Sequence, residues 1–169
     1  DIYAQLIYIA HEADVPTFLD SSGQALRHVV AANPFLIKQN ETEISILANR
    51  KPTTIAEFAD VAVTIATRYE TIVMVSLGKK GALAVKGETA VYLQPPPVSA
   101  KSAVGSGDCM VAGLVYGFSQ GLDWVAAAKY GVAGGTANTL ILGAGRFSRH
   151  DFAAILPRVV SKKIRGNYS

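Results

Sequence analysis

The 169-residue sequence predicts an α/β protein built on a doubly wound, mostly parallel sheet. Short apolar segments that suit buried strands alternate with segments of helical periodicity through residues 1–77. The segment 71–77 is rich in β-branched residues and has a continuous apolar run at 72–75, as strands of parallel sheets have when both faces are covered. Half of the residues are hydrophobic and 17% are charged, a composition typical of a globular chain.

The first part of the chain predicts three strands separated by helices. A helical stripe of Ile2, Leu6, Ile9 and Ala10 predicts the first helix. The turn Ser21-Ser22-Gly23 leads into the second helix, which carries apolar Leu26, Val29 and Val30. We expect strands over 16–20, 35–37 and 71–77, and further helices over 41–49 and 54–69.

The second part of the chain has a different pattern. Short strands at 82–85 and 90–93, joined at Gly87-Glu88, predict an antiparallel hairpin at an edge of the sheet. Three consecutive prolines at 95–97 predict a stiff connector. Helices are then expected from the turn at Gly105 to about 120, over 123–142 and over 149–161.

A glycine-rich turn, Gly105-Ser106-Gly107, is followed by an apolar run with helical spacing. Such a turn at a helix start leaves backbone N–H groups without partners, and anions such as phosphate bind there. A carboxylate beside an anion site is useful when it accepts a proton, so Asp108 fits phosphoryl transfer to a hydroxyl group. The other interpretation is a plain turn in which Asp108 caps the helix.

A second candidate segment, Lys38 to Glu43, follows a predicted strand. Open α/β sheets bind ligands at the carboxyl ends of their strands, and Lys38 could reach a nucleotide phosphate there. Asn40 and Glu43 are three residues apart, so at a helix start they could face the same way and order water around Mg²⁺. The same pair also fits a capping box with Asn40 as the N-cap residue.

Two other segments are rich in glycine. Ser76-Leu77-Gly78-Lys79-Lys80-Gly81 leaves a strand end, where its glycines would let the backbone approach a ligand or simply form a tight turn. Residues 131–139 form a helical segment of small residues that includes Gly135 and Asn138. Glycine in a helix costs about 1 kcal/mol relative to alanine, and close helix packing is one explanation for its presence.

The segment from Val104 to Gly113 resembles the C-terminal signature of the ribokinase-like (phosphofructokinase B type) carbohydrate kinases. It is most similar to the branch with 1-phosphofructokinase and tagatose-6-phosphate kinase. Asn40 and Glu43 match the family's Asn-x-x-Glu motif, and the loop from Ser76 to Gly81 matches its Ser-Leu-Gly-x-x-Gly motif. The sequence departs from the family's usual residues at Gln39, Ala103, Ser106 and Cys109.

The resemblance implies a three-layer ribokinase-like fold that uses ATP and Mg²⁺ to phosphorylate a ketohexose phosphate. It implies an anion hole at Gly105, Ser106 and Gly107, with Asp108 as the catalytic base. It further implies nucleotide contacts from Lys38, Asn40, Ser76, Gly78 and Gly81, magnesium organised by Asn40 and Glu43, and adenine contacts from Gly135 and Asn138.

Members of this family are nearly twice as long as this chain. The resemblance therefore implies that residues 1–169 are the C-terminal part of a single kinase domain, without the half that carries most sugar contacts and the lid. The alternatives are a nucleotide-binding fragment without catalysis, or a kinase of this fold for another sugar or nucleoside. The family often dimerises through its lid, so a homodimer is expected of the full-length protein.

Composition excludes several other classes. Basic and aromatic residues are not interleaved, so no nucleic-acid partner is expected despite the net charge of +3. No apolar run approaches 18 residues, so no membrane span is expected, and a single cysteine fits a cytoplasmic location. A Rossmann oxidoreductase would need a G-x-G-x-x-G after its first strand, which the sequence lacks.

Overall fold

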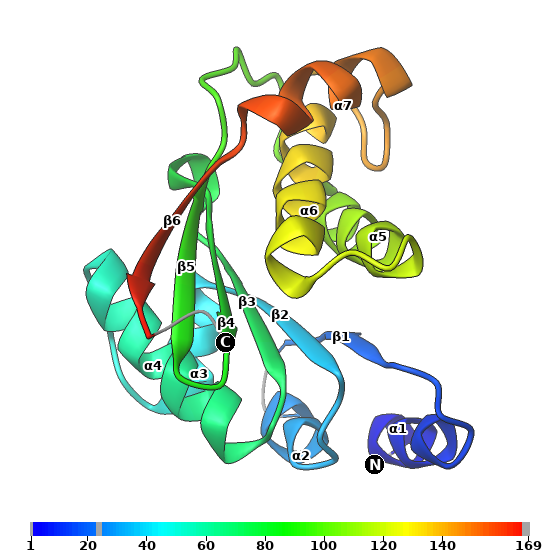
Figure 1. Ribbon diagram of the computed structural model, residues 1–169, viewed down its shortest axis with the longest axis vertical. Coiled ribbons are helices and arrows are strands. Elements are labelled where there is room, and N and C mark those ends of the chain that lie inside the picture. The colour runs from blue at the N-terminus through cyan, green and yellow to red at the C-terminus, as the bar shows by residue number, and fades with distance from the viewer. Residues whose placement is uncertain (1, 23–24, 167–169) are drawn as a thin grey trace. The chain divides into compact units, whose positions relative to one another are not determined.

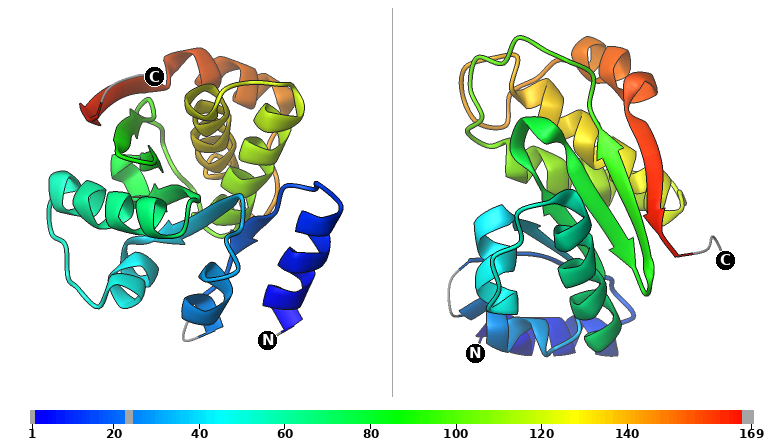
Figure 2. Two further views of the ribbon diagram at one scale, coloured as in Figure 1. Left: turned by 60° about the horizontal axis from the view of Figure 1, so that its bottom comes forward. Right: turned by 90° about the vertical axis from the view of Figure 1, so that its left-hand side faces the viewer.

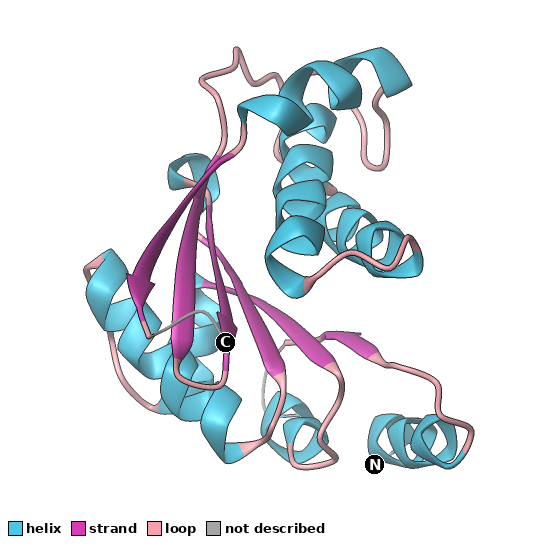
Figure 3. Cartoon of the chain, viewed as in Figure 1, coloured by secondary structure: helices cyan, strands magenta, loops and turns pink. Residues whose placement is uncertain are grey.

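The computed structural model describes residues 2–22 and 25–166, and it has the expected α/β fold (Figures 1 and 3). Six strands form one sheet in the order β1-β2-β3-β4-β5-β6. The chain divides into two compact units. The first comprises Asp1–Leu77, Leu83–Ala90 and Lys163–Ser169, and the second comprises Gly78–Ala82 and Val91–Lys162.

The first unit contains the parallel part of the sheet. Its elements are α1 (Ile2–Glu12), β1 (Phe18–Asp20), α2 (Ala25–Val30), β2 (Leu36–Asn40), α3 (Glu41–Ala48), α4 (Ile55–Arg68) and β3 (Ile72–Ser76). Strand β2 pairs in parallel with β1, where Asp20 lies opposite Lys38, and with β3, where Asn40 lies opposite Ser76. The carboxyl ends of the three strands therefore meet at one edge, as the sequence predicted.

The core of this unit follows from continuous burial of its strands. Every residue of β2 and β3 except the last one of each is buried, including the polar Lys38 and Gln39. Helix α4 buries the predicted face with Phe58, Val61, Ala62 and Ile65. The expected turn at Ser21-Ser22-Gly23 lies partly outside the described residues.

Helix α1 forms as predicted, but its apolar stripe lies on the surface. Ile2, Leu6 and Ile9 are 66%, 55% and 62% exposed, whereas Ile7 is the buried residue of this helix at 5%. Among the described residues, no helix has the length and apolar character needed to span a bilayer.

The second unit contains two closely packed helices, α5 (Ser106–Ser119) and α6 (Trp124–Asn138). Glycines let their backbones approach, because a Cβ at Gly134 would lie 2.6 Å from the Cys109 carbonyl oxygen and one at Gly113 would overlap the Tyr130 carbonyl. Strands β4 (Ala82–Lys86) and β5 (Thr89–Gln94) form the predicted hairpin and contribute to both units.

The two predicted helices near the C-terminus end earlier than expected. Helix α6 ends at Asn138 and not near residue 142. The last helix, α7 (Arg149–Ile155), passes into a 3₁₀ turn at Leu156–Arg158, because Pro157 cannot continue an α-helix, and strand β6 (Val160–Arg165) follows. This strand neighbours β5, so the hairpin does not form the edge of the sheet (Figure 2).

Candidate active site

The start of helix α5 is a sharp backbone turn at Gly105. This residue is the N-cap, with φ 80° and ψ 0°. Residues other than glycine adopt this left-handed backbone conformation only at a cost in free energy. The N–H of Ser106 donates to the Ala103 carbonyl at 3.1 Å, and the N–H of Cys109 donates to the Gly105 carbonyl at 3.0 Å. These bonds close the turn and start the helix.

The turn leaves a set of backbone donors available for a ligand. Among the described residues, no hydrogen bond is made by the N–H groups of Gly105, Gly107 and Asp108. The positive end of the helix dipole adds to them, so the arrangement favours a bound anion. The sequence also suggested the Ser106 amide, but the structure uses that group inside the turn.

Asp108 is the acidic residue of the first turn of α5, and it is exposed. It makes no salt bridge within the described part of the chain, so its carboxylate is accessible for a proton. Burial raises the pKa of the neighbouring Cys109 thiol, the Asp108 charge raises it further, and a hydrogen bond from the Gly145 backbone opposes both effects. Cys109 therefore stays a neutral thiol near pH 7.

Gly135 and Asn138 lie inside the second unit. A Cβ at Gly135 would lie 3.0 Å from the Ser106 carbonyl oxygen, which accounts for the glycine by close packing of α6 on α5. Asn138 is fully buried, and its amide forms hydrogen bonds to the chain around the Gly105 turn. The structure thus favours helix packing, the explanation that the sequence left open for this segment.

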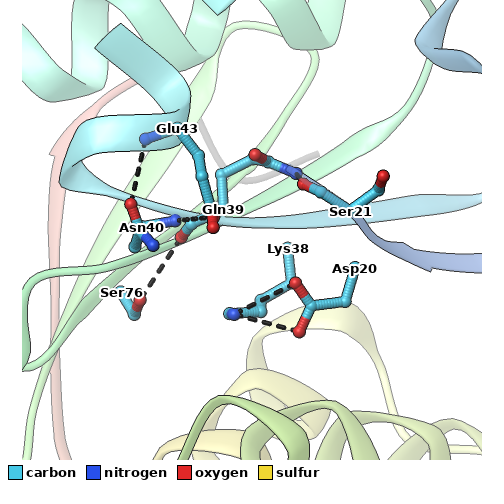
Figure 4. Close-up of polar contacts among 7 residues, drawn as sticks. All are labelled: Asp20, Ser21, Lys38, Gln39, Asn40, Glu43 and Ser76. Atoms are coloured by element: carbon cyan, nitrogen blue, oxygen red, sulfur yellow. Dashed lines mark hydrogen bonds and ion pairs between the residues drawn. The ribbon is translucent and has the colours of Figure 1, made fainter. Parts of the chain in front are cut away.

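At the strand edge of the first unit, Lys38 pairs with an acid that ends the neighbouring strand (Figure 4). Its ammonium nitrogen lies 3.2 and 3.0 Å from the two carboxylate oxygens of Asp20. The lysine side chain is 8% exposed and the aspartate side chain 29%. The pairing follows from the parallel register, which places the last residue of β1 opposite Lys38.

Asn40 and Glu43 form a complete capping box at the start of α3 (Figure 4). Asn40 Oδ1 accepts the N–H groups of Thr42 and Glu43, both at 2.9 Å, and Glu43 Oε2 accepts the Asn40 N–H at 2.8 Å. The second carboxylate oxygen, Oε1, has no hydrogen bond within the described residues. The cap that the sequence allowed is therefore present, and it leaves one carboxylate oxygen for another role.

Strand β3 ends at Ser76, whose hydroxyl donates to the Gln39 carbonyl at 3.4 Å. Gly78 opens a 3₁₀ turn with φ 56°, and nothing lies within 4 Å of a Cβ built there. Gly81, with φ 108°, is different, because a Cβ there would overlap the Leu93 carbonyl of its own unit. Gly78 thus leaves open space at the backbone, while Gly81 is required by packing.

The donors in this part of the chain suit magnesium only through water. Among the described residues, no cluster of three or more His, Cys, Asp or Glu side chains could hold a metal ion. Mg²⁺ keeps several waters and binds one or two carboxylates together with phosphate oxygens. Glu43 Oε1 fits that limited role, whereas the oxygen of the Asn40 amide is already used by the cap.

The structure thus brings the predicted residues together in separate groups. In the first unit, Lys38, Asn40, Glu43 and Ser76 gather at the carboxyl ends of β2 and β3 (Figure 4). In the second unit, Gly135 and Asn138 of α6 lie against the glycine turn, and Asp108 lies in the first turn of α5, which follows that turn. The Lys38 partner, Asp20, was not among the predicted site residues, although its place at a strand end was the signal that could have found it.

The groups at the start of α5 suit phosphoryl transfer, because amides can hold the charge of a transferring phosphoryl group and a carboxylate can accept a hydroxyl proton. Comparison with known proteins gives the particular family. Residues 1–149 match the pfkB family of carbohydrate kinases, and the chain belongs to that family. The resemblance seen in the sequence is thereby confirmed.

The curated relatives are named as sugar-phosphate kinases. The chain is 37% identical over 149 residues to ATP-dependent 6-phosphofructokinase isozyme 2 of Escherichia coli, covering 87% of this chain and 48% of that protein. It is 35% identical over 133 residues to 1-phosphofructokinase of Rhodobacter capsulatus, covering 79% and 42%. Tagatose-6-phosphate kinase of Staphylococcus epidermidis is 39% identical over 121 residues, covering 69% and 39%. The chain spans about half the length of these relatives, or less.

Solved structures confirm the fold. Escherichia coli phosphofructokinase-2 in complex with potassium matches with a TM-score of 0.86 and 35% identity, over 92% of this chain and 51% of that chain. Another structure of that enzyme, 34% identical, is described as its tetrameric inhibited form. Arabidopsis thaliana ribokinase matches with a TM-score of 0.80 over 92% of this chain and 52% of that one, and at 21% identity it supports the fold alone.

Proposed function

We propose that this chain carries the catalytic base and the nucleotide-binding residues of an ATP-dependent kinase that phosphorylates a hydroxyl group of a ketohexose phosphate. One observation carries the proposal. Within the described residues, the start of α5 offers N–H groups of Gly105, Gly107 and Asp108 that make no hydrogen bond, together with an exposed carboxylate that makes no salt bridge. The names of the relatives support the substrate class.

In the proposed reaction, Asp108 accepts the proton of the acceptor hydroxyl. The freed oxygen attacks the γ-phosphorus of ATP, the bond between that phosphorus and its bridging oxygen breaks, and ADP leaves. Negative charge spreads over the three oxygens of the transferring group, so donors fixed in place before the reaction lower the barrier. The amides of Gly105, Gly107 and Asp108 are those donors, and the left-handed turn at Gly105 fixes them.

The residues of the first unit are proposed to serve the nucleotide and its metal ion. Magnesium would neutralise charge on the ATP phosphates, held by water to Glu43 Oε1 while Asn40 keeps that carboxylate in position through the capping box. Lys38 and Ser76 complete the proposed nucleotide contacts of this unit, and Gly78 and Gly81 are proposed nucleotide contacts of the second unit. Because the Lys38 ammonium is already paired with Asp20, we propose that it acts together with this acid.

The proposal extends to the protein as a whole. Residues 1–169 would be the C-terminal part of a single kinase domain of a cytoplasmic protein, and the rest of that domain would supply most sugar contacts. We propose a homodimer for the full-length protein and no nucleic-acid or membrane partner. Fructose 1-phosphate, fructose 6-phosphate and tagatose 6-phosphate are the candidate acceptors.

A nucleotide-binding fragment without catalysis is the second candidate. It is supported by the extent of the chain, which covers between 39% and 48% of the relatives compared above. A fragment of this kind would bind Mg-ATP weakly and transfer no phosphoryl group.

An assay that couples ADP release to a dye signal separates the candidates. It is run on the 169-residue chain and on the full-length protein with each of the three ketohexose phosphates, and without an acceptor as the control. The proposal expects acceptor-dependent ADP release from the full-length protein. Mg-ATP binding by both forms without ADP release from either would contradict the kinase and favour the non-catalytic module.

A further inference from the structure

Asn138, the last residue of α6, connects three parts of the second unit. It is fully buried, with 0% of its surface exposed. Its Nδ2 donates to the Val104 carbonyl at 2.8 Å and to Ser106 Oγ at 3.2 Å. Its Oδ1 accepts from the Arg146 N–H at 3.2 Å and from Cys109 Sγ at 3.4 Å.

This set uses the complete hydrogen-bonding capacity of the amide. An asparagine side chain offers two N–H donors and one oxygen with two lone pairs, and each has a partner here. The orientation is also fixed, because the Val104 carbonyl can only accept and the Arg146 N–H can only donate. A buried, satisfied amide of this kind holds its partners in one arrangement, since leaving one of them unpaired costs about 1–3 kcal/mol.

The bond to Val104 determines where the first free amide points. The Val104 carbonyl and the Gly105 N–H belong to the same planar trans peptide, so they point in opposite directions. Holding the carbonyl toward Asn138 therefore turns the Gly105 N–H away from α6. The second donor bond, to Ser106 Oγ, fixes the residue on the other side of Gly105.

The oxygen of the same amide holds the loop segment 144–146 against the Gly105 turn. A Cβ built on Gly105 would lie 2.7 Å from the Cβ of Ala144 and 3.0 Å from the Gly145 nitrogen, so this loop packs directly on the glycine. The bond from the Arg146 N–H attaches the end of the loop to Asn138. One side chain thus connects both the turn and the segment that packs on it to the end of α6.

We propose that Asn138 is a positioning residue for phosphoryl transfer: it fixes the peptide between Val104 and Gly105 so that the amides at the start of α5 face the transferring group. The inference rests on the proposed function and replaces a direct contact between Asn138 and the purine. It predicts that loss of the amide lowers kcat more than it weakens ATP binding, because the donors act on charge that develops in the transition state.

The test uses Asn138→Leu, which keeps the approximate volume and removes the four hydrogen bonds. Thr136→Val is the matched control, because Thr136 is buried in the same helix and, among the described residues, its hydroxyl bonds only to the Val132 carbonyl of that helix. Turnover is measured in whichever form, the 169-residue chain or the full-length protein, carries the kinase activity, well below the melting temperature of each variant. We expect Asn138→Leu to lower kcat at least tenfold with a KM for ATP within threefold of the parent, and Thr136→Val to keep kcat.

A second measurement remains valid if the parent protein transfers no phosphate. Hydrogen–deuterium exchange follows the amides of Ser106 and Cys109, which are bonded within the turn. We expect Asn138→Leu to speed their exchange at least tenfold relative to Thr136→Val. Unchanged exchange, or a kcat equal to that of the control in an active protein, would overturn the positioning role, whereas an inactive parent with faster exchange in Asn138→Leu overturns only the proposed function.

Discussion

Replacing Gly105 with alanine tests the geometry of the turn on which the site depends. The substitution adds one methyl group at a residue with φ 80°. That methyl would lie 2.7 Å from the Cβ and 2.8 Å from the Cα of Ala144, distances at which atoms overlap. Two costs therefore arise, one from the left-handed backbone and one from the overlap.

The size of each cost can be estimated. A left-handed conformation costs a residue with a Cβ about 1–2 kcal/mol. Extra atoms in a packed site cost about 1–3 kcal/mol, and Ala144 can yield only by moving its backbone. Alanine also lowers the conformational entropy of the unfolded chain, which offsets these costs by about 0.4–1 kcal/mol. We therefore expect Gly105→Ala to lower the free energy of unfolding by about 1–5 kcal/mol.

Gly121→Ala separates the two costs. Gly121 has φ 73°, close to that of Gly105, but nothing lies within 4 Å of a Cβ built there. Its alanine variant carries the backbone cost and the entropy gain alone, so urea denaturation of the two variants isolates the overlap. We expect Gly105→Ala to be less stable than Gly121→Ala by about 1–3 kcal/mol. Equal stability of the two variants would show that the loop at Ala144 does not pack on the turn.

Two further predictions concern the first unit. Asp20→Asn leaves the buried Lys38 ammonium without its charged partner, and we expect it to lower the free energy of unfolding by about 1–3 kcal/mol, less than for a fully buried pair because the Asp20 side chain is 29% exposed. In urea denaturation of Asp20→Asn, Lys38→Met and the double variant, the double variant should lose less stability than the sum of the two single losses. Additive losses would contradict the pairing. Asn40→Ala and Thr54→Ala each remove the N-cap side chain of a capping box, and each should lower the free energy of unfolding by about 1 kcal/mol in the same measurement. Only Asn40→Ala should also reduce Mg-ATP-dependent turnover. Equal turnover of the two variants would leave Asn40 with a structural role alone.

Much of the fold could be predicted because the deciding patterns are local. Strand β3 has a continuous apolar run before Ser76, and α4 repeats its apolar residues at helical spacing between two caps. Strand β6 could not be found in this way. Its residues are mostly exposed, so it has no alternation of buried and exposed side chains, and the preceding apolar residues suggested a longer helix.

The site could be predicted only where one segment contains all of its parts. The turn from Gly105 to Asp108 and the capping box from Asn40 to Glu43 are of this kind. The pair of Asp20 with Lys38 and the bonds of Asn138 to the Gly105 turn join residues 18 or more positions apart. Such contacts depend on strand register and helix packing, which the pattern along one segment does not contain.

The central claim, that Asp108 removes the proton of the acceptor hydroxyl, is tested most directly by the turnover of Asp108→Asn in the active form of the protein. Glu88→Gln, which removes a charge from an exposed residue of the β4–β5 turn, is the control. Loss of a general base lowers the rate by about 10²–10⁴-fold, so kcat of Asp108→Asn should fall by that factor. The Kd of Asp108→Asn for Mg-ATP should stay close to that of the parent protein, and so should the kcat of Glu88→Gln. A kcat for Asp108→Asn within threefold of the parent would contradict the account.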